Sequence, residues 1–295
     1  MKLAIDIGSN TIKCLLARKD GSGGLEKFFE RSLESRISAG RGRLVDSAAD
    51  IISSSIKTLV AEAKTSAPDF EVLAVATSAL RDAPNRAEVA AAVLGATGVP
   101  VKILSGDEEA RLSYLGACSD PAVAAFGTKT YFDLGGGSLE IVCGVGLEVK
   151  RSASLTVGAV SLTKMFCDGE IVGEAQSDAI DRYVSEALSC VEIPRAEVLV
   201  GAGGAVVAAR MLNQKLNGVS SNIITLADIG AFAELLAKMT VAERVEKFLL
   251  AKSRADILVS ALLCVRALMR RAGHKTLLHT FNNLRYGIIL DDYGK

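Results

Sequence analysis

Two turns in the sequence combine an acidic residue with glycine and hydroxyl side chains. Asp6 and Asp133 each lie near the end of an apolar run, and a Gly-rich turn follows each of them. Glycine lets backbone N–H groups approach an anion closely, so such a turn binds phosphate without net positive charge. The turn residues expected to contact phosphate are Gly8, Ser9, Asn10 and Thr11 in the first turn and Gly135, Gly136, Gly137 and Ser138 in the second.

The two turns differ in how strongly they indicate a phosphate site rather than an ordinary hairpin. The first has the composition of an ordinary hairpin, because Gly, Ser and Asn are common in turns. The second has three consecutive glycines, each costing about 0.5–1 kcal/mol relative to alanine, which is more than a plain hairpin needs. Asp6 and Asp133 hold the same place before their turns, where a carboxylate suits a hydrated divalent cation. The repetition favours a phosphate–metal site over two unrelated hairpins.

Two further segments have both a structural and a chemical interpretation. Gly203 and Gly204 follow an apolar run and open a helix, which is an anion-binding arrangement, although close packing of a strand on a helix explains them almost as well. Glu108 and Glu109 lie in the first helical turn after Ser105, where acidic residues favour the helix dipole. Successive helical residues point about 100° apart, so one of the two can instead serve as a general base.

Arginines are the remaining candidates for binding phosphate. Arg81 follows a strand and a turn, and a guanidinium can bind two phosphate oxygens, but an isolated arginine at a strand end is more often solvated. Arg36, Arg41 and Arg43 form the densest basic segment. A phosphate contact and a solvated loop are both consistent with this segment.

The apolar pattern predicts the strands and helices that must position these residues. Three strands in succession are expected at the N-terminus, with the first turn between the first two. The same order recurs around the second turn, which indicates a structural repeat with little sequence identity. The expected strands are residues 2–7, 11–17, 27–37, 72–76, 99–104, 128–133, 139–143, 147–155 and 198–200, and the expected helices are 48–63, 85–94, 105–116, 176–190, 204–216, 226–239, 242–249, 254–272 and 278–290.

Length and composition indicate two globular domains in the cytoplasm. A chain of 295 residues is too long for one ordinary core, and we expect domains at 1–120 and 121–295, with the last helix packing back on the first. The net charge of +0 gives no basic field for nucleic acid, and no apolar stretch is long enough to span a membrane. Six scattered cysteines without a CxxC pair favour reduced thiols, and only two histidines leave catalysis to carboxylates.

Nearly the whole chain resembles the exopolyphosphatase and guanosine pentaphosphate phosphohydrolase (Ppx/GppA) family of the actin-like ATPase superfamily. The segments that match, besides the first turn, keep the order of the family and are 36–40, 76–85, 104–112, 133–140, 157–160, 201–204, 254–256 and 284–287. The resemblance implies an α/β fold of two actin-like (RNase H-like) domains, with mixed sheets flanked by helices and a cleft between them.

The resemblance also implies roles for individual residues. Glu109 rather than Glu108 becomes the catalytic base, and Asp133 and Glu140 position metal and water. The metal, Mg²⁺ or Mn²⁺, is expected on Asp6, Asp133 and Glu140. Phosphate is expected on the two turns and also on Arg81, Gly203 and Gly204. The chain departs from the family at Leu139 and Ala205, where Thr is common, and at Tyr286, where Glu is frequent.

The implied activity is hydrolysis of the terminal phosphoanhydride of inorganic polyphosphate by a homodimer. Guanosine pentaphosphate is the alternative substrate, since it exposes the same kind of terminal bond. The chain ends at Lys295, without the helical C-terminal domain of long family members, so we expect a preference for shorter chains. Alternatives of other classes are a small-molecule kinase of the same superfamily, a filament subunit and a non-catalytic nucleotide sensor.

Overall fold

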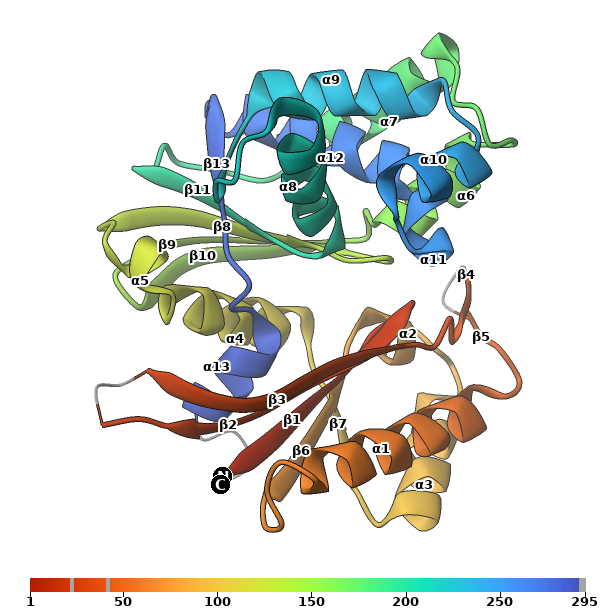
Figure 1. The fold of residues 1–295 in the computed structure, drawn as a ribbon, viewed down its shortest axis with the longest axis vertical. Helices are drawn as coiled ribbons and strands as arrows, with labels where there is room; N and C mark the ends of the chain where they lie inside the picture. The colour runs from red at the N-terminus through yellow and green to blue at the C-terminus, as the bar shows by residue number, and fades with distance from the viewer. Residues whose placement is uncertain (22–23, 41–42, 292–295) are drawn as a thin grey trace. The chain divides into compact units, whose positions relative to one another are not determined.

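The computed structural model describes residues 1–21, 24–40 and 43–291. The chain forms two compact units (Figure 1). Unit 1 comprises Met1–Pro121 together with Asn282–Lys295, and unit 2 comprises Ala122–Phe281. The chain therefore leaves unit 1 once and returns to it for its last helix. Arg41, named above in the basic segment, lies outside the described residues.

Unit 1 is built on a mixed sheet of five strands. The strands lie in the order β3-β2-β1-β6-β7. The first three form an antiparallel meander, whereas β6 and β7 continue the sheet parallel to β1. Their bounds are β1 (Lys2–Ile7), β2 (Thr11–Lys19), β3 (Leu25–Glu34), β6 (Glu71–Ala76) and β7 (Val101–Ile103). A separate two-stranded ribbon joins β4 (Ser38–Gly40) and β5 (Arg43–Leu44).

Both faces of this sheet are covered because its central strands are apolar on both sides. Leu3, Ile5 and Ile7 pack on one face with helix α1, and Ala4 packs on the other. This alternation follows from the two-residue period of a strand. The helices of unit 1 are α1 (Ala48–Lys64), α2 (Ser78–Arg81), α3 (Arg86–Thr97), α4 (Gly106–Cys118) and α13 (Leu284–Leu290).

The last helix, α13, packs against α4 with almost no space between the two backbones. A Cβ added at Gly287 would lie 1.8 Å from the Leu112 carbonyl oxygen, and one at Gly116 would lie 2.0 Å from that of Asn283. Only glycine permits such an approach. Arg285 fastens the same helix to the sheet, because its Nη1 donates to the carbonyl of Cys14 at 3.0 Å.

Unit 2 repeats the strand order of unit 1 and adds one strand. Its sheet has the order β10-β9-β8-β11-β13-β12. The first three strands in sequence form an antiparallel meander, β11 and β13 continue parallel, and β12 pairs antiparallel at the edge. Their bounds are β8 (Thr128–Leu134), β9 (Leu139–Val145), β10 (Glu148–Leu155), β11 (Val198–Ala202), β12 (Ile223–Thr225) and β13 (Thr276–His279).

An apolar core lies between this sheet and the helices of unit 2. Helix α12 lies at its centre and is buried along almost its whole length, as a helix apolar on nearly all sides must be. The other helices are α6 (Ala159–Phe166), α7 (Glu174–Ser189), α8 (Gly204–Asn217), α9 (Leu226–Ala237), α10 (Val241–Phe248) and α11 (Lys252–Ala255), with α12 at Leu258–Arg271 and the short α5 (Pro121–Ala124) where the chain passes between the units. The predicted fold class, α/β with two mixed sheets flanked by helices, is confirmed.

The sequence interpretation of the C-terminal third was wrong in two places. The helix expected at 278–290 begins only at Leu284, and Thr276–His279 form β13, which lies between β11 and the edge strand β12. A short apolar run does not distinguish a buried strand from a helix. The helix expected at 254–272 is divided into α11 and α12, because the α-helical run stops at Asp256 and Ile257. Helix α6 and strand β12 were not predicted.

In the described part of the chain, no helix combines the length and apolar character needed to cross a bilayer.

Candidate functional site

The two Gly-rich turns have the same backbone construction. We call Gly8–Thr11 loop 1 and Gly135–Ser138 loop 2. In loop 1 the Gly8 N–H donates to the Thr11 carbonyl at 3.1 Å, and in loop 2 the Gly135 N–H donates to the Ser138 carbonyl at 2.9 Å. Each loop connects the first two strands of a meander, β1 to β2 and β8 to β9. The repeat inferred from the sequence is therefore present at the level of individual hydrogen bonds.

Loop 2 is held from one side by the start of helix α6. The N–H of Ala159 donates to the Gly135 carbonyl at 3.0 Å, and that of Val160 donates to the Gly136 carbonyl at 2.9 Å. A trans peptide directs its C=O and N–H to opposite sides. The N–H groups of Gly136 and Gly137 therefore point away from α6, in the direction from which an anion can approach.

Gly158 makes this contact between loop 2 and α6 possible. A Cβ at Gly158 would lie 2.3 Å from the Gly136 carbonyl oxygen and 2.5 Å from the Gly137 carbonyl carbon. Real Cβ atoms do not approach other atoms so closely, and here the obstacle is backbone rather than a mobile side chain. The absence of a side chain at Gly158 thus sets the position of loop 2.

Loop 1 is held by the segment that follows β3. The Asn10 carbonyl accepts hydrogen bonds from the N–H groups of Ser35, at 3.0 Å, and Arg36, at 3.3 Å. Loop 1 and loop 2 are thus each fixed through their carbonyl oxygens by main-chain N–H groups from a later segment of the same unit.

Two carboxylates lie side by side at the base of loop 2. Asp133 on β8 and Glu140 on β9 are direct partners in the antiparallel ladder, so their side chains share one face of the sheet. Glu140 is 2% exposed, and its Oε1 accepts from the Ser154 hydroxyl at 3.0 Å. Gly203, at φ 92°, leaves room for Asp133, whose Oδ1 would lie 2.6 Å from a Cβ there. Two like charges directly opposite each other are destabilising unless a cation or a proton intervenes.

This donor set fits a magnesium ion that completes its shell with substrate and water. Mg²⁺ prefers oxygen ligands and is usually held by one or two protein carboxylates together with phosphates. Asp133 and Glu140 supply that number from one sheet face. Across the residues that the structure describes, no group of three or more His, Cys, Asp or Glu side chains is arranged so that it could hold a metal ion without other ligands.

Asp6 is the counterpart of Asp133 in unit 1, but its surroundings differ. Its ladder partner on β2 is Lys13, not an acid. Burial raises the pKa of the Asp6 carboxyl above its ordinary value of 3.8, and the charges of Lys13 and Arg285 act in the opposite direction. The structure thus holds an acidic group at a position where its ionised form is poorly solvated.

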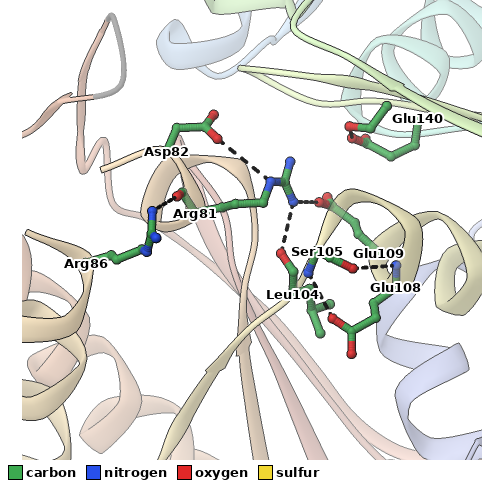
Figure 2. A network of polar contacts seen from close by, with 9 residues as sticks. Arg81, Asp82, Arg86, Leu104, Ser105, Glu108, Glu109 and Glu140 are labelled. Atoms are coloured by element: carbon green, nitrogen blue, oxygen red, sulfur yellow. Dashed lines mark hydrogen bonds and ion pairs between the residues drawn. The ribbon is translucent and has the colours of Figure 1, made fainter. Parts of the chain in front are cut away.

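The first turn of α4 separates the two neighbouring glutamates (Figure 2). Ser105 caps the helix, since its Oγ accepts from the Glu108 N–H at 3.2 Å and its N–H donates to Glu108 Oε2 at 2.9 Å. This bond from the Ser105 N–H lowers the pKa of Glu108. Glu108 is therefore a capping residue. Glu109 lies elsewhere on the helix and is only 8% exposed.

Arg81 holds Glu109 in place. Its Nη1 donates to Glu109 Oε2 at 2.7 Å and to the Leu104 carbonyl at 3.2 Å (Figure 2). The two contacts fix the Arg81 guanidinium between the end of β7 and the first turn of α4, and the guanidinium in turn orients the Glu109 carboxylate. The sequence interpretation gave Arg81 a phosphate-binding role, and that role stays a prediction. The structure shows its contact with Glu109, which sequence spacing did not reveal.

Arg254 is a candidate that the sequence interpretation left without a role. Its Nη1 donates to the Gly204 carbonyl at 2.8 Å, at the start of α8. Burial lowers the pKa of Arg254, and no carboxylate of the described residues forms an ion pair with it. A poorly solvated cation beside the N-terminus of a 14-residue helix is a suitable place for a phosphate oxygen. The only feature of the sequence that pointed to Arg254 was its place in the segment 254–256, which matches the family.

The residues predicted from the sequence therefore fall into two groups, one in each unit. Unit 1 carries Asp6, loop 1 with Gly8, Ser9, Asn10 and Thr11, and the Arg81–Glu109 ion pair. Unit 2 carries Asp133, Glu140, loop 2 with Gly135, Gly136, Gly137 and Ser138, and the glycines Gly203 and Gly204. Their catalytic, phosphate-binding and metal-binding roles stay predictions.

Comparison with solved structures shows the same fold in several proteins. A Ppx/GppA family member of Aquifex aeolicus is 24% identical, with a TM-score of 0.82, over 99% of this chain and 96% of that one. An exopolyphosphatase of Cytophaga hutchinsonii is 20% identical, with a TM-score of 0.88, over 99% and 98%. An exopolyphosphatase-like protein is 25% identical, with a TM-score of 0.87, over 99% and 97%. The fold is thus the actin-like fold of these two-domain proteins.

The model of the Ppx/GppA phosphatase family matches residues 21–295, which is nearly the whole chain. This match extends over both units and includes loop 2, the Arg81–Glu109 pair and the α4–α13 contact. The chain belongs to the Ppx/GppA phosphatase family.

Proposed function

We propose that this protein is an exopolyphosphatase that hydrolyses the terminal phosphoanhydride of inorganic polyphosphate. The observation that carries the proposal is the construction of loop 2. Its carbonyls are held by α6, its N–H groups point the other way, and the carboxylates of Asp133 and Glu140 lie at its base. Exposed amides beside paired carboxylates suit a phosphate–metal cluster better than a plain hairpin does.

Phosphate binding is assigned mainly to main-chain N–H groups. The amides of loop 2 are assigned to phosphoryl oxygens in unit 2, and the corresponding amides of loop 1 are assigned the same task in unit 1. At the start of α8, Gly203 and Gly204 bring backbone N–H groups and the helix dipole, and Arg254 adds a guanidinium. These groups are fixed before substrate arrives, so little reorganisation is needed when charge develops in the transition state.

The divalent cation, Mg²⁺ or Mn²⁺, is assigned to Asp133 and Glu140, with Asp6 as the acidic residue of unit 1. When bound, it offsets charge on the phosphoryl oxygens. The chain's part is to hold two carboxylates on one sheet face and to keep Glu140 buried under the Ser154 hydroxyl. A fixed ligand geometry of this kind is what a small, strongly hydrated cation requires.

Glu109 is assigned the role of general base. It is buried, paired with Arg81 and held at the start of α4 by a capped first turn. In the proposed step it accepts a proton from the water that attacks the terminal phosphorus, and the phosphoanhydride oxygen departs with the shortened chain. Phosphoryl transfer needs little beyond positioning and charge stabilisation. A kinase would direct an acceptor hydroxyl here instead of water.

The experiment is phosphate release from defined substrates by the purified protein. Polyphosphates of several fixed lengths and guanosine pentaphosphate are compared, each with Mg²⁺ and with EDTA. We expect metal-dependent release of phosphate from polyphosphate. Release only from guanosine pentaphosphate would identify the alternative phosphohydrolase. Phosphate transfer that requires an added metabolite would indicate a kinase, and binding without any release would indicate a sensor. Each of these outcomes contradicts the proposal.

A further inference from the structure

Three residues on neighbouring strands of unit 2 form a row across its sheet. Asp133 on β8 is the ladder partner of Glu140 on β9, and Glu140 is the ladder partner of Ser154 on β10. Directly paired residues of adjacent strands lie on the same face of a sheet. The row therefore extends beyond the two carboxylates assigned to the cation, and it ends at Ser154 because β10 is the edge strand.

This row lies on the face of the sheet that is opposite the apolar core of unit 2. Leu139 and Ile141, the neighbours of Glu140 along β9, both belong to that core. Successive residues of a strand point to opposite faces, so Glu140 points away from the core. Glu140 is nevertheless only 2% exposed. A carboxylate with so little access to water depends on neighbouring polar groups for its solvation.

The two ladder neighbours of Glu140 act on its carboxylate in opposite ways. Asp133 is a second acid, and like charges directly opposite each other are destabilising. Ser154 instead donates its hydroxyl to Glu140 Oε1 at 3.0 Å. A hydrogen bond to an ionised acceptor is stronger than one between neutral groups, and its preferred geometry restricts the orientation of both partners. The hydroxyl thus holds the Glu140 carboxylate in one orientation beside a group of the same charge.

The structure of the strand does not require a serine at this position. The Ser154 side chain is exposed on an edge strand, so it does not fill the apolar core. The ladder bonds of β10 are made by main-chain groups, which every residue except proline supplies in full. What serine adds is one hydroxyl directed at a carboxylate that we assign to the cation.

We propose that Ser154 is a positioning residue for the divalent cation. Its hydroxyl orients the Glu140 carboxylate so that Glu140 and Asp133 ligate one ion together. The inference rests on the part of the proposed function that assigns the cation to these two carboxylates. Groups that hydrogen-bond to metal ligands orient them and tune the affinity of the site, and their removal typically weakens metal binding about 10–100-fold.

Two substitutions of equal shape test the role of the hydroxyl. Ser154→Thr keeps the hydroxyl, whereas Ser154→Val has the shape of threonine without it. Both β-branched residues suit a strand and the position is exposed, so both variants are expected to fold. Ser152→Ala is the control, because Ser152 lies on the same face of β10 and its ladder partner is Val142 rather than an acid. Electron paramagnetic resonance of unbound Mn²⁺ measures the affinity of each metal-free protein for the ion.

We expect Ser154→Val to bind Mn²⁺ about tenfold or more weakly than the wild type, and Ser154→Thr and Ser152→Ala to stay within about threefold of it. In phosphate release, the Mg²⁺ concentration that gives half-maximal rate should rise by the same factor in Ser154→Val, and kcat at saturating Mg²⁺ should change little. A merely structural role would lower the melting temperature in EDTA and leave the Mn²⁺ affinity unchanged. A loss of less than about tenfold in Ser154→Val, or an equal loss in Ser154→Thr or Ser152→Ala, would overturn the inference.

Metal binding without substrate distinguishes this inference from the proposed function. If the wild type releases no phosphate but Ser154→Val still weakens Mn²⁺ binding, the proposed function fails and the inference stands. If the wild type is active and Ser154→Val binds Mn²⁺ equally well, the inference alone fails. A wild type that binds no Mn²⁺ would overturn both the inference and the assignment of the cation to Asp133 and Glu140.

Discussion

Replacing Gly158 with alanine tests whether helix α6 sets the position of loop 2. The added Cβ would lie 2.3 Å from the Gly136 carbonyl oxygen, whereas ordinary contacts begin near 3.4 Å. Loop 2 or the start of α6 must therefore shift by about 1 Å. The shift lengthens the hydrogen bonds from Ala159 to Gly135 and from Val160 to Gly136, which are 3.0 and 2.9 Å long.

The expected effect on stability is modest and the effect on activity is large. Overpacking of this kind costs roughly 1–3 kcal/mol of the free energy of unfolding. A displacement of about 1 Å in groups that position the substrate costs on the order of 100-fold in kcat/KM. We expect this loss because, in the proposed function, the Gly136 and Gly137 amides bind phosphoryl oxygens and would be displaced from them.

Urea unfolding and phosphate release at a fixed temperature measure the two effects of Gly158→Ala separately. Gly169→Ala is the matched control, because a Cβ at Gly169 meets no atom within 4 Å in the same unit. The control should keep wild-type activity. A folded Gly158→Ala protein whose activity stays within about threefold of wild type would refute the idea that this contact positions loop 2.

Two further predictions concern unit 1. Asp6→Asn should raise the melting temperature at pH 7 in EDTA. Burial raises the pKa of the Asp6 carboxyl above 3.8, so at pH 7 the folded protein holds this carboxylate in a poorly solvated place, and asparagine removes the charge. The wild type loses stability as the pH rises from 3.8 through the raised pKa of Asp6. The stability advantage of Asp6→Asn should therefore shrink as the pH falls towards 3.8. An Asp6→Asn variant that is less stable than the wild type at pH 7 would contradict this prediction. Gly287→Ala should cost roughly 1–3 kcal/mol in urea unfolding, since its Cβ would lie 1.8 Å from the Leu112 carbonyl oxygen. Gly95→Ala, which meets no atom within 4 Å, should instead leave stability unchanged or raise it.

Much of the fold near the two loops was accessible from the sequence because the signals there are local. The strand expected at 2–7 matches β1, and the Ser105–Glu108 capping box was visible as a residue pattern. The two acid-and-glycine turns and the repeat of strands around them were likewise recognisable. In each case neighbouring residues decide the structure, through burial of an apolar run or through a cap.

The parts that were missed depend on contacts between residues distant in the chain. Leu278 and His279 were assigned to a helix because nothing local shows that β11 provides a parallel partner. Glu109 meets Arg81 across 28 positions, and Gly204 meets Arg254 across 50. A single sequence does not show which distant residues contact each other. From the residues alone, helix capping was therefore the simpler explanation of Glu109, and only the structure shows its ion pair with Arg81.

The most direct measurement of the central proposal compares Glu109→Gln with Glu108→Gln in phosphate release from polyphosphate. The two residues are adjacent, but Glu108 caps α4 whereas Glu109 pairs with Arg81. We expect Glu109→Gln to bind tripolyphosphate and to lose about 10²–10⁴-fold in kcat, as for a missing general base. Glu108→Gln should retain most of its kcat and lose only some stability. Near-wild-type turnover by Glu109→Gln, or an equal loss in both variants, would contradict the assignment of Glu109 as the base.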